Sequence, residues 1–318
     1  MKLKKLYDLV IANGMRKDPR GSSIVAKELK ALKVKYAALS KKQAEEFDIE
    51  RLKNPYSDTR ILHGSGNETI RNVLIGIDID VGEVLLADRL IQKGKKIDLI
   101  IAHHPEGSAL AALHQVMYMQ ADIVHLHGVP ITIAEDLIKN RISEVERRLL
   151  PVNHTKTQDA ARLLNIPLLC VHTPADNHVV CFLEQLFEKK NPETLEQIID
   201  ILKSIPEYQH AIKNNSGPKV VNGSDDSRPG KIFVDMTGGT EGSKDIFKNL
   251  AQAGIGTIVG MHLSEEHIKK AKKEHINVII AGHISSDNLG LNLILDSIET
   301  VQKLDVIACS GFVRVKRK

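Results

Sequence analysis

Short apolar runs alternate with helix-length segments along most of the chain, and this alternation limits the folds open to it. The runs are rich in β-branched residues, and Gly, Pro or Asp bounds nearly all of them, at residues 73–77, 97–102, 166–171, 231–235, 256–259, 277–281 and 304–308. Strands separated by helices are typical of βαβ units and a parallel sheet. Strands without polar alternation suit a sheet that is covered on both faces. We therefore expect an α/β fold with mainly parallel strands.

The length and one loop-rich segment predict two lobes. A chain of 318 residues fits two domains of roughly 100–200 residues each, or one large α/β domain. The segment 213–230 is rich in Asn, Gly, Ser and Pro, as linkers and long loops are. With a boundary between about 190 and 230, we expect an N-terminal lobe at 1–190 and a C-terminal lobe at 191–318, with helical additions at 1–70 and 107–165.

Composition excludes several classes of protein. Apolar residues make up 42% and charged residues 26%, as in ordinary globular chains, and no apolar run approaches the ~18 residues of a membrane span. Three cysteines do not suggest a disulfide scaffold, and the amphipathic start lacks the core of a signal peptide. We expect a cytoplasmic protein in a reducing compartment, without a membrane partner.

Charge and aromatic content speak against a nucleic-acid partner. The formal net charge is +4, and the last five residues alone carry four basic side chains. The body of the chain shows no basic stripe of the kind that displaces counterions from nucleic acid. Aromatic residues make up 3%, too few for base-stacking platforms. We therefore expect a small-molecule substrate.

Histidines and carboxylates gather at the ends of three apolar runs. The runs at 97–102, 166–171 and 277–281 are followed by side chains that can bind metal: His103, His104, His172, Asp176, His283 and Asp287. In open α/β sheets, ligands bind beyond the carboxyl ends of the strands, so we expect these residues to share one crevice. Imidazole and carboxylate together suit Zn, Fe, Mn, Co or Ni, and more than four such ligands can hold two ions. Two ions can clamp a phosphoryl or carbonyl group and activate water.

Each histidine also has a plainer interpretation. A lone histidine after a strand is more often a satisfied polar residue than a ligand. His103 and His104 would point to opposite sides of a continuing strand, and only a turn at Pro105 brings both to one site. His172 can serve merely to orient its loop, since Asp176 is the more natural ligand. Packing is the expected role of seven further histidines: His114, His125, His127, His154, His210, His267 and His275.

A glycine-rich turn at residues 236–243 follows another predicted strand. We expect it to open a helix at 244–253, so that backbone amides of Thr237, Gly238 and Gly239 can cradle an anion at the helix N-terminus. The spacing is not that of a P-loop. Near two metal ions, the turn would form a pocket for phosphate or carboxylate.

Taken together, these motifs resemble the NGG-interacting factor three-like (NIF three-like) family, also called GTP cyclohydrolase I type-two-like. The matching segments lie in the same order within residues 70–310: DLIIAHHP (98–105), HTPAD (172–176), TGGTEGS (237–243) and AGHISSD (281–287). The resemblance implies two interlocked α/β lobes with a dinuclear metal site between them, and a homo-oligomer, typically a toroidal hexamer. It also implies five ligands, with bridges from the two carboxylates: His103, His104, Asp176, His283 and Asp287.

The chain departs from the family pattern in three places. The family usually has glutamate where this chain has Asp287, so the resemblance implies a looser bridge or a changed metal preference. The stretch between His104 and Asp176 is longer and more helical than usual, and the chain before residue 70 is also extended. These additions would reshape the oligomer or cover the site.

The site residues favour a metal-dependent hydrolase that acts on a phosphoester or nucleotide-like substrate through two divalent ions. Glu106 and His172 are the candidate proton carriers. The alternative is a non-enzymatic protein that binds metal or a partner, with a partner surface on the helical addition at 107–165. A metal site without an open coordination position would favour that alternative.

Overall fold

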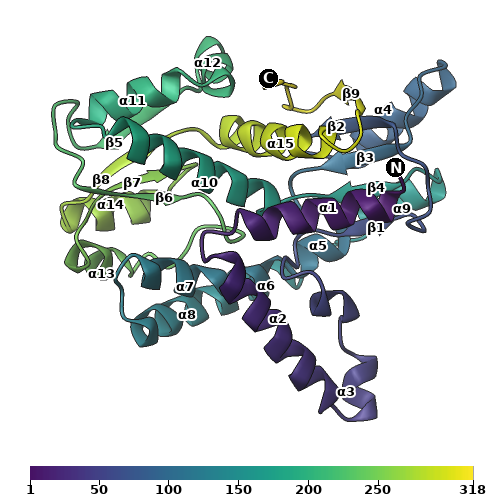
Figure 1. The fold of residues 1–318 in the computed structure, drawn as a ribbon, viewed down its shortest axis with the longest axis horizontal. Helices are drawn as coiled ribbons and strands as arrows, with labels where there is room; N and C mark the ends of the chain where they lie inside the picture. The colour runs from purple at the N-terminus through teal and green to yellow at the C-terminus, as the bar shows by residue number, and fades with distance from the viewer. Residues whose placement is uncertain (318) are drawn as a thin grey trace.

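The computed structural model describes residues 1–317 and contains two mainly parallel sheets (Figure 1). The first sheet has the strand order β1-β4-β3-β2-β9, and the second has the order β5-β8-β7-β6. Among the strands of residues 1–317, β1 with β4 and β5 with β8 are the antiparallel pairs. The strands are β1 (Ile61–His63), β2 (Asn72–Gly76), β3 (Leu99–Ala102), β4 (Leu168–Cys170), β5 (Lys219–Asn222), β6 (Lys231–Asp235), β7 (Ile255–Gly260), β8 (Asn277–Ile280) and β9 (Asp305–Ala308). The expected α/β fold is confirmed.

Helices connect and cover these sheets. Within residues 1–317, none of them is long and apolar enough to cross a membrane. They are α1 (Leu3–Arg16), α2 (Ser22–Ala37), α3 (Lys41–Glu45), η1 (Ile49–Leu52), α4 (Val81–Gln92), α5 (Gly107–Ala111), α6 (Leu113–Val116), α7 (Met119–Leu126), α8 (Ile131–Leu149), α9 (Lys156–Leu163), α10 (Thr173–Lys190), α11 (Leu195–Lys203), α12 (Pro206–Lys213), α13 (Phe247–Gln252), α14 (Glu265–Lys273) and α15 (His283–Glu299).

The last strand crosses back to the first sheet. β9 pairs in parallel with β2, with Val306 opposite Val73. The helix before it, α15, packs along α10, and the two helices lie side by side in the middle of the molecule (Figure 1). The two sheets therefore do not separate at residue 190 along the chain, although the lobe limits 1–190 and 191–318 themselves stay predictions. The crossing explains how the lobes interlock.

The segment 54–69 contains the short strand β1, which pairs with β4. One sequence prediction about an individual element was wrong in detail. The helix expected at 244–253 begins only at Phe247 and has six residues. Its late start separates the glycine turn from the helix N-terminus.

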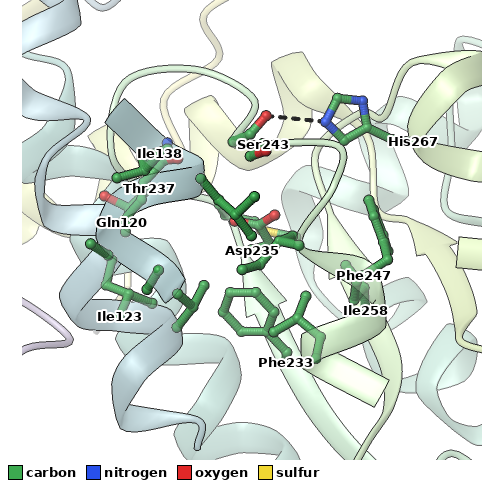
Figure 2. Close-up of a pocket in the computed structure, with 18 of the residues that line it drawn as sticks. Gln120, Ile123, Ile138, Phe233, Asp235, Thr237, Ser243, Phe247, Ile258 and His267 are labelled. Atoms are coloured by element: carbon green, nitrogen blue, oxygen red, sulfur yellow. Dashed lines mark hydrogen bonds between the residues drawn. The ribbon is translucent and has the colours of Figure 1, made fainter. Parts of the chain in front are cut away.

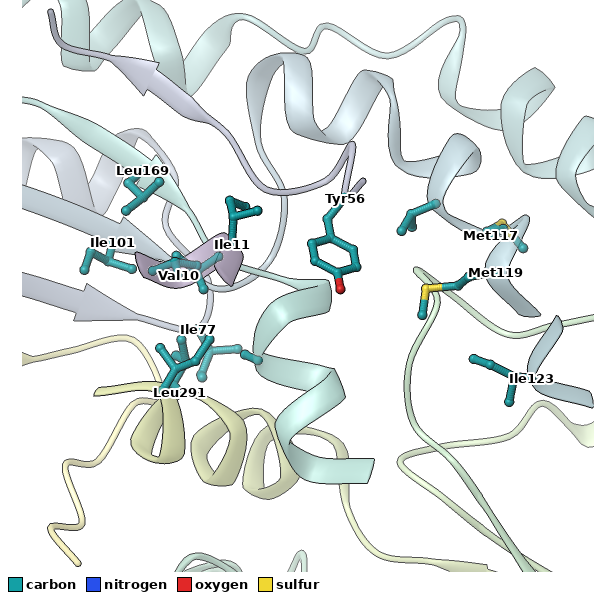
Figure 3. Close-up of a cluster of buried hydrophobic side chains, with 14 of the residues drawn as sticks. Val10, Ile11, Tyr56, Ile77, Ile101, Met117, Met119, Ile123, Leu169 and Leu291 are labelled. Atoms are coloured by element: carbon teal, nitrogen blue, oxygen red, sulfur yellow. The ribbon is translucent and has the colours of Figure 1, made fainter. Parts of the chain in front are cut away.

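The helical addition at 107–165 covers the edge strand β6 of the second sheet. Ile123 of α7 and Ile138 of α8 face Phe233 of β6 across a cavity with mainly apolar walls (Figure 2). Figure 3 shows that Ile123 and Met119 lie in the same buried cluster as Ile101 of the first sheet. Since one buried cluster reaches from the first sheet to α7, the addition is part of the main core rather than an appendage.

Candidate metal centre

Five buried ligand atoms meet between α10, α15 and the end of β3. Within residues 1–317 none of these atoms has a hydrogen-bond partner: Nε2 of His103 and of His104, Oδ1 of Asp176, and both carboxylate oxygens of Asp287. A buried polar atom left unpaired costs about 1–3 kcal/mol, so native proteins rarely leave several together. Several unpaired nitrogen and carboxylate oxygen atoms that face one another in this way are typical of a metal site.

The spacing of these atoms fits ligands of shared ions. His103 Nε2 lies 3.5 Å from Asp176 Oδ1 and 3.3 Å from Asp287 Oδ1, and His104 Nε2 lies 3.4 Å from Asp287 Oδ2. These distances are long for a strong hydrogen bond. Two ligands on one tetrahedral ion, each about 2.1 Å from it, are separated by about 3.4 Å. The residues present therefore fit divalent metal.

Two groups of side chains can each hold an ion. One consists of His103, His172 and Asp176, and the other of His103, His104 and Asp287. Asp287 turns one oxygen toward His103 and the other toward His104, so it can join two positions despite being shorter than glutamate. Asp176 Oδ1 is 3.5 Å from His103 Nε2, and its Oδ2 is 3.8 Å from His172 Nδ1, the nitrogen that also contacts Asp58. The bridging role of Asp176 stays a prediction.

The two helices that carry the carboxylates begin in the same way. His172 caps α10 with Asp176 four residues later, and His283 begins α15 with Asp287 four residues later. Residues four apart share one face of a helix, so each histidine lies beside its carboxylate. His283 Nε2 is 3.7 Å from Asp287 Oδ2. The positive end of the α10 dipole also favours the carboxylate of Asp176, which lies in the first turn of that helix.

Register brings the strand ends together. Ala102 of β3 pairs with Gly76 of β2 on one side and with Cys170 of β4 on the other, so the residues that follow β3 and β4 emerge side by side. The His103 and His104 rings are 5.3 Å apart between centroids, and both face the site. The turn that the sequence required at this point is present.

The second ring nitrogen of three histidines is held by an oxygen. His103 Nδ1 is 2.9 Å from the carbonyl oxygen of Val171, His104 Nδ1 is 2.7 Å from Asp78, and His172 Nδ1 is 2.8 Å from Asp58. Metal-binding histidines are typically oriented in this way. Sequence reasoning missed both carboxylates, because each lies in a turn-rich segment whose spacing reveals no partner.

The pKa values of the carboxylates diverge. Burial raises the pKa of Asp176 to about 6, although His172 and His103 oppose the change. Burial also acts to raise the pKa of Asp287, but the adjacent His103 and His104 outweigh it and hold that pKa well below its usual range. Burial lowers the pKa of His283 to about 4. Asp287 is thus ionised, and His283 is neutral near pH 7, as ligands must be.

Comparison with solved structures decides the family. A structure described as a NIF3 superfamily protein from Sphaerobacter thermophilus is 30% identical to this chain. The match covers 80% of this chain and 91% of that chain, with a TM-score of 0.70. The chain belongs to the NIF3 superfamily. The family expected from the ordered motifs is thereby confirmed.

A second solved structure shares the fold of this NIF3 superfamily member. Reduced HcgD from Methanocaldococcus jannaschii is 17% identical, with coverage of 84% of this chain and 94% of that chain and a TM-score of 0.52. At this identity the likeness concerns the fold alone. Neither a family model nor a curated protein matches the sequence.

The predicted proton carriers of this NIF3 protein lie in different surroundings. His172 lines the cavity beside Asp176 and Asp287. Glu106 caps α5 and is not among the residues that line this cavity; burial raises the pKa of its carboxyl group, with Lys156 opposing. A catalytic role for either residue stays a prediction.

The glycine turn forms one wall of the cavity. Thr237 and Gly239 line it, while Gly238 packs against Gln120, whose Nε2 donates to the carbonyl oxygens of Gly238 and Thr240 at 2.7 and 2.6 Å. With φ of +96° and +90°, Gly238 and Gly239 adopt a backbone conformation that other residues rarely reach.

The glycine turn lacks the helix N-terminus expected directly behind it, because α13 begins at Phe247, beyond the turn. Anion binding by Thr237, Gly238 and Gly239 stays a prediction. Two carboxylates, Asp235 and Glu241, line the cavity at this wall instead. Asp235 also points into the apolar cavity behind the turn (Figure 2). Burial raises the pKa of Asp235 to about 6, and the charge of Glu241 adds to the rise. This wall is acidic, and an anion would have to be held by metal ions.

Proposed function

We propose that this NIF3 superfamily protein is a metal-dependent hydrolase that acts on a phosphoester or nucleotide-like substrate. The observation that carries the proposal is the cluster of five unpartnered buried ligand atoms, which belongs to two groups that share His103. When bound, a pair of divalent ions activates water and neutralises charge on a phosphoryl oxygen. The candidate ions in this proposal are Zn, Fe, Mn, Co and Ni, which suit imidazole and carboxylate ligands.

The residues would have separate roles in such a centre. His103 and Asp176 would hold one ion, His104 and His283 would hold the other, and Asp287 would contribute to both. The half-exposed His283 leaves the approach open on its side, where the substrate enters the cavity. His172, oriented by Asp58, passes a proton to the leaving group. Its place on the cavity wall supports this role over Glu106.

Turnover of a panel of phosphodiesters, phosphomonoesters and nucleotides, with Mn²⁺ or Zn²⁺ added, tests this function. We expect a substrate whose hydrolysis falls at least about 100-fold in His104→Ala, because a ligand of one ion is lost. The matched control is His210→Ala, which removes an exposed histidine on α12. If the His104→Ala protein and the unaltered protein hydrolyse every compound equally, the hydrolase proposal fails.

We further propose that the protein assembles as a homo-oligomer, with a hexamer as the first expectation. Support comes from α2, which projects from the body of the molecule and buries only Val25 (Figure 1). Val34 on this helix is 67% exposed. An exposed apolar side chain on a projecting helix suits a contact with another copy.

Light scattering after gel filtration measures the assembly. Val34→Glu is expected to lower the mass of the assembly, because a buried charge at the contact is costly. Leu163→Glu on α9, an equally exposed apolar position outside the projecting helix, is expected to leave the mass unchanged. A monomeric unaltered protein would contradict the proposal.

A further inference from the structure

The imidazoles at the metal centre form a row that extends beyond the predicted ligands. Neighbouring ring centroids are 5.0 Å apart for His172 and His103, 5.3 Å for His103 and His104, and 5.0 Å for His104 and His283. The row then continues to His262, whose ring is 4.7 Å from that of His283. Two imidazoles on one tetrahedral ion, with bonds of about 2.0–2.1 Å, have centroids about 5 Å apart. His262 thus has the spacing of a neighbouring ligand.

His262 is also oriented as a ligand would be. It follows β7, and its Nδ1 is 3.1 Å from Oε1 of Glu241 on the glycine turn. The same carboxylate-to-imidazole contact orients His104 through Asp78 and His172 through Asp58. Within residues 1–317 the His262 ring is hydrogen-bonded through Nδ1, and its Nε2 has no hydrogen-bond partner. The side chain lines the cavity and is 48% exposed. Its free nitrogen is available on the solvent side of the centre.

A second histidine beside Glu241 shows the contrast. His267 lies 3.7 Å from Oε2 of Glu241, but both of its ring nitrogens have other contacts. Its Nδ1 is 2.6 Å from the hydroxyl of Ser264, and its Nε2 is 3.2 Å from the carbonyl oxygen of Gly242. His267 therefore holds the loop, whereas His262 keeps one nitrogen free.

We propose that His262, oriented by Glu241, is an additional metal ligand on the solvent side of the ion held by His104, His283 and Asp287. This inference rests on the metal centre of the proposed function, and not on catalysis. The glycine turn then contributes to the metal centre, because its Glu241 carboxylate orients the ring of His262. The exposed position makes His262 the ligand that exchanges most readily.

Cobalt binding to the full-length protein tests the inference without an activity assay. After removal of metal with a chelator, Co²⁺ is titrated while heat and visible absorption are recorded. The unaltered protein is expected to bind two ions. His262→Gln is expected to weaken one of the two binding events about tenfold or more and to alter its absorption, leaving the other unchanged. Glu241→Gln is expected to weaken the same event to a smaller extent.

Control variants keep the outcomes distinct. His210→Gln, on exposed α12, is expected to bind Co²⁺ as the unaltered protein does, and circular dichroism checks that each variant is folded. If His262→Gln binds two ions with unchanged affinity and absorption, the inference is overturned while the dinuclear centre stands. If the unaltered protein binds no Co²⁺, the centre itself is wrong, and the proposed function falls with it.

Discussion

Asp287→Asn is expected to abolish tight binding of both metal ions. One oxygen of this carboxylate faces His103 and the other faces His104, so in the proposed centre both ion positions would depend on it. The amide has the same shape, but it offers one oxygen and a hydrogen-bond donor in place of two anionic oxygens. Loss of a residue that merely orients a ligand typically weakens metal binding about 10–100-fold. Asp287→Asn changes a ligand itself, so we expect binding to be weaker by at least about 100-fold. Elemental analysis and calorimetric titration measure the ions per chain and their affinity.

Thermal unfolding provides an independent measurement of the same loss. Metal at 100 times its dissociation constant stabilises a folded protein by about 2.7 kcal/mol, so added metal should raise the melting temperature of the unaltered protein. Asp287→Asn should lose most of that rise. Asp305→Asn, an exposed carboxylate paired with Arg71, serves as the control and should retain it. Two tightly bound ions per chain in Asp287→Asn would refute the bridging arrangement.

The strand-end ligands were predictable because a parallel sheet brings the carboxyl ends of its strands to one edge. His103 and His104 follow β3, and Asp176 comes soon after β4 in the same sheet. Nothing local in the sequence says that α15, from the second sheet, packs against α10. The strand-end argument placed His283 and Asp287 in the shared crevice, but β8 lies in the second sheet, so the packing of α15 against α10 is what brings them there.

The residues that orient the ligands could not be predicted. Asp58 and Asp78 come from turns, and they reach their histidines only because the chain folds 114 and 26 residues apart into contact. Glu241 and His262 likewise meet across 21 residues. The glycine turn was recognised, but its helix begins three residues later than the pattern predicted, so the turn does not adjoin a helix N-terminus. Hydrogen bonds between distant loops leave no periodic signal in a single sequence.

The contact between α10 and α15 sets the separation of the two carboxylates. A Cβ atom at Gly290 of α15 would lie 2.5 Å from the carbonyl oxygen of Ala175 and 2.9 Å from Cγ2 of Val179, both on α10. Ala175 precedes Asp176, and Gly290 follows Asp287 by three residues. The absence of a side chain at Gly290 therefore lets the two helices approach closely enough for their carboxylates to share His103.

Gly290→Val is expected to destabilise the protein and to weaken the binding of metal beside His103, which both Asp176 and Asp287 face. Overpacking costs about 1–3 kcal/mol, and more where the obstacle is backbone, as here. With about 2–4 °C of melting temperature for each kcal/mol, we expect a fall of about 2–12 °C. Metal sites tolerate about 0.2 Å in ligand distance, so a helix shift of about half an ångström already disturbs the site.

Differential scanning calorimetry and Co²⁺ titration measure the two effects in Gly290→Val. Gly290→Ala should show smaller changes in the same direction, because it adds only the Cβ atom. Gly82→Ala, near the exposed start of α4, is the matched control. Its Cβ would lie 3.2 Å from Oδ1 of the exposed Asp80 carboxylate and, among residues 1–317, within 4 Å of no backbone atom of a packed neighbour, so both properties should stay near those of the unaltered protein. A Gly290→Val protein with unchanged melting temperature and metal affinity would mean that the separation of the carboxylates is set elsewhere than at this helix contact.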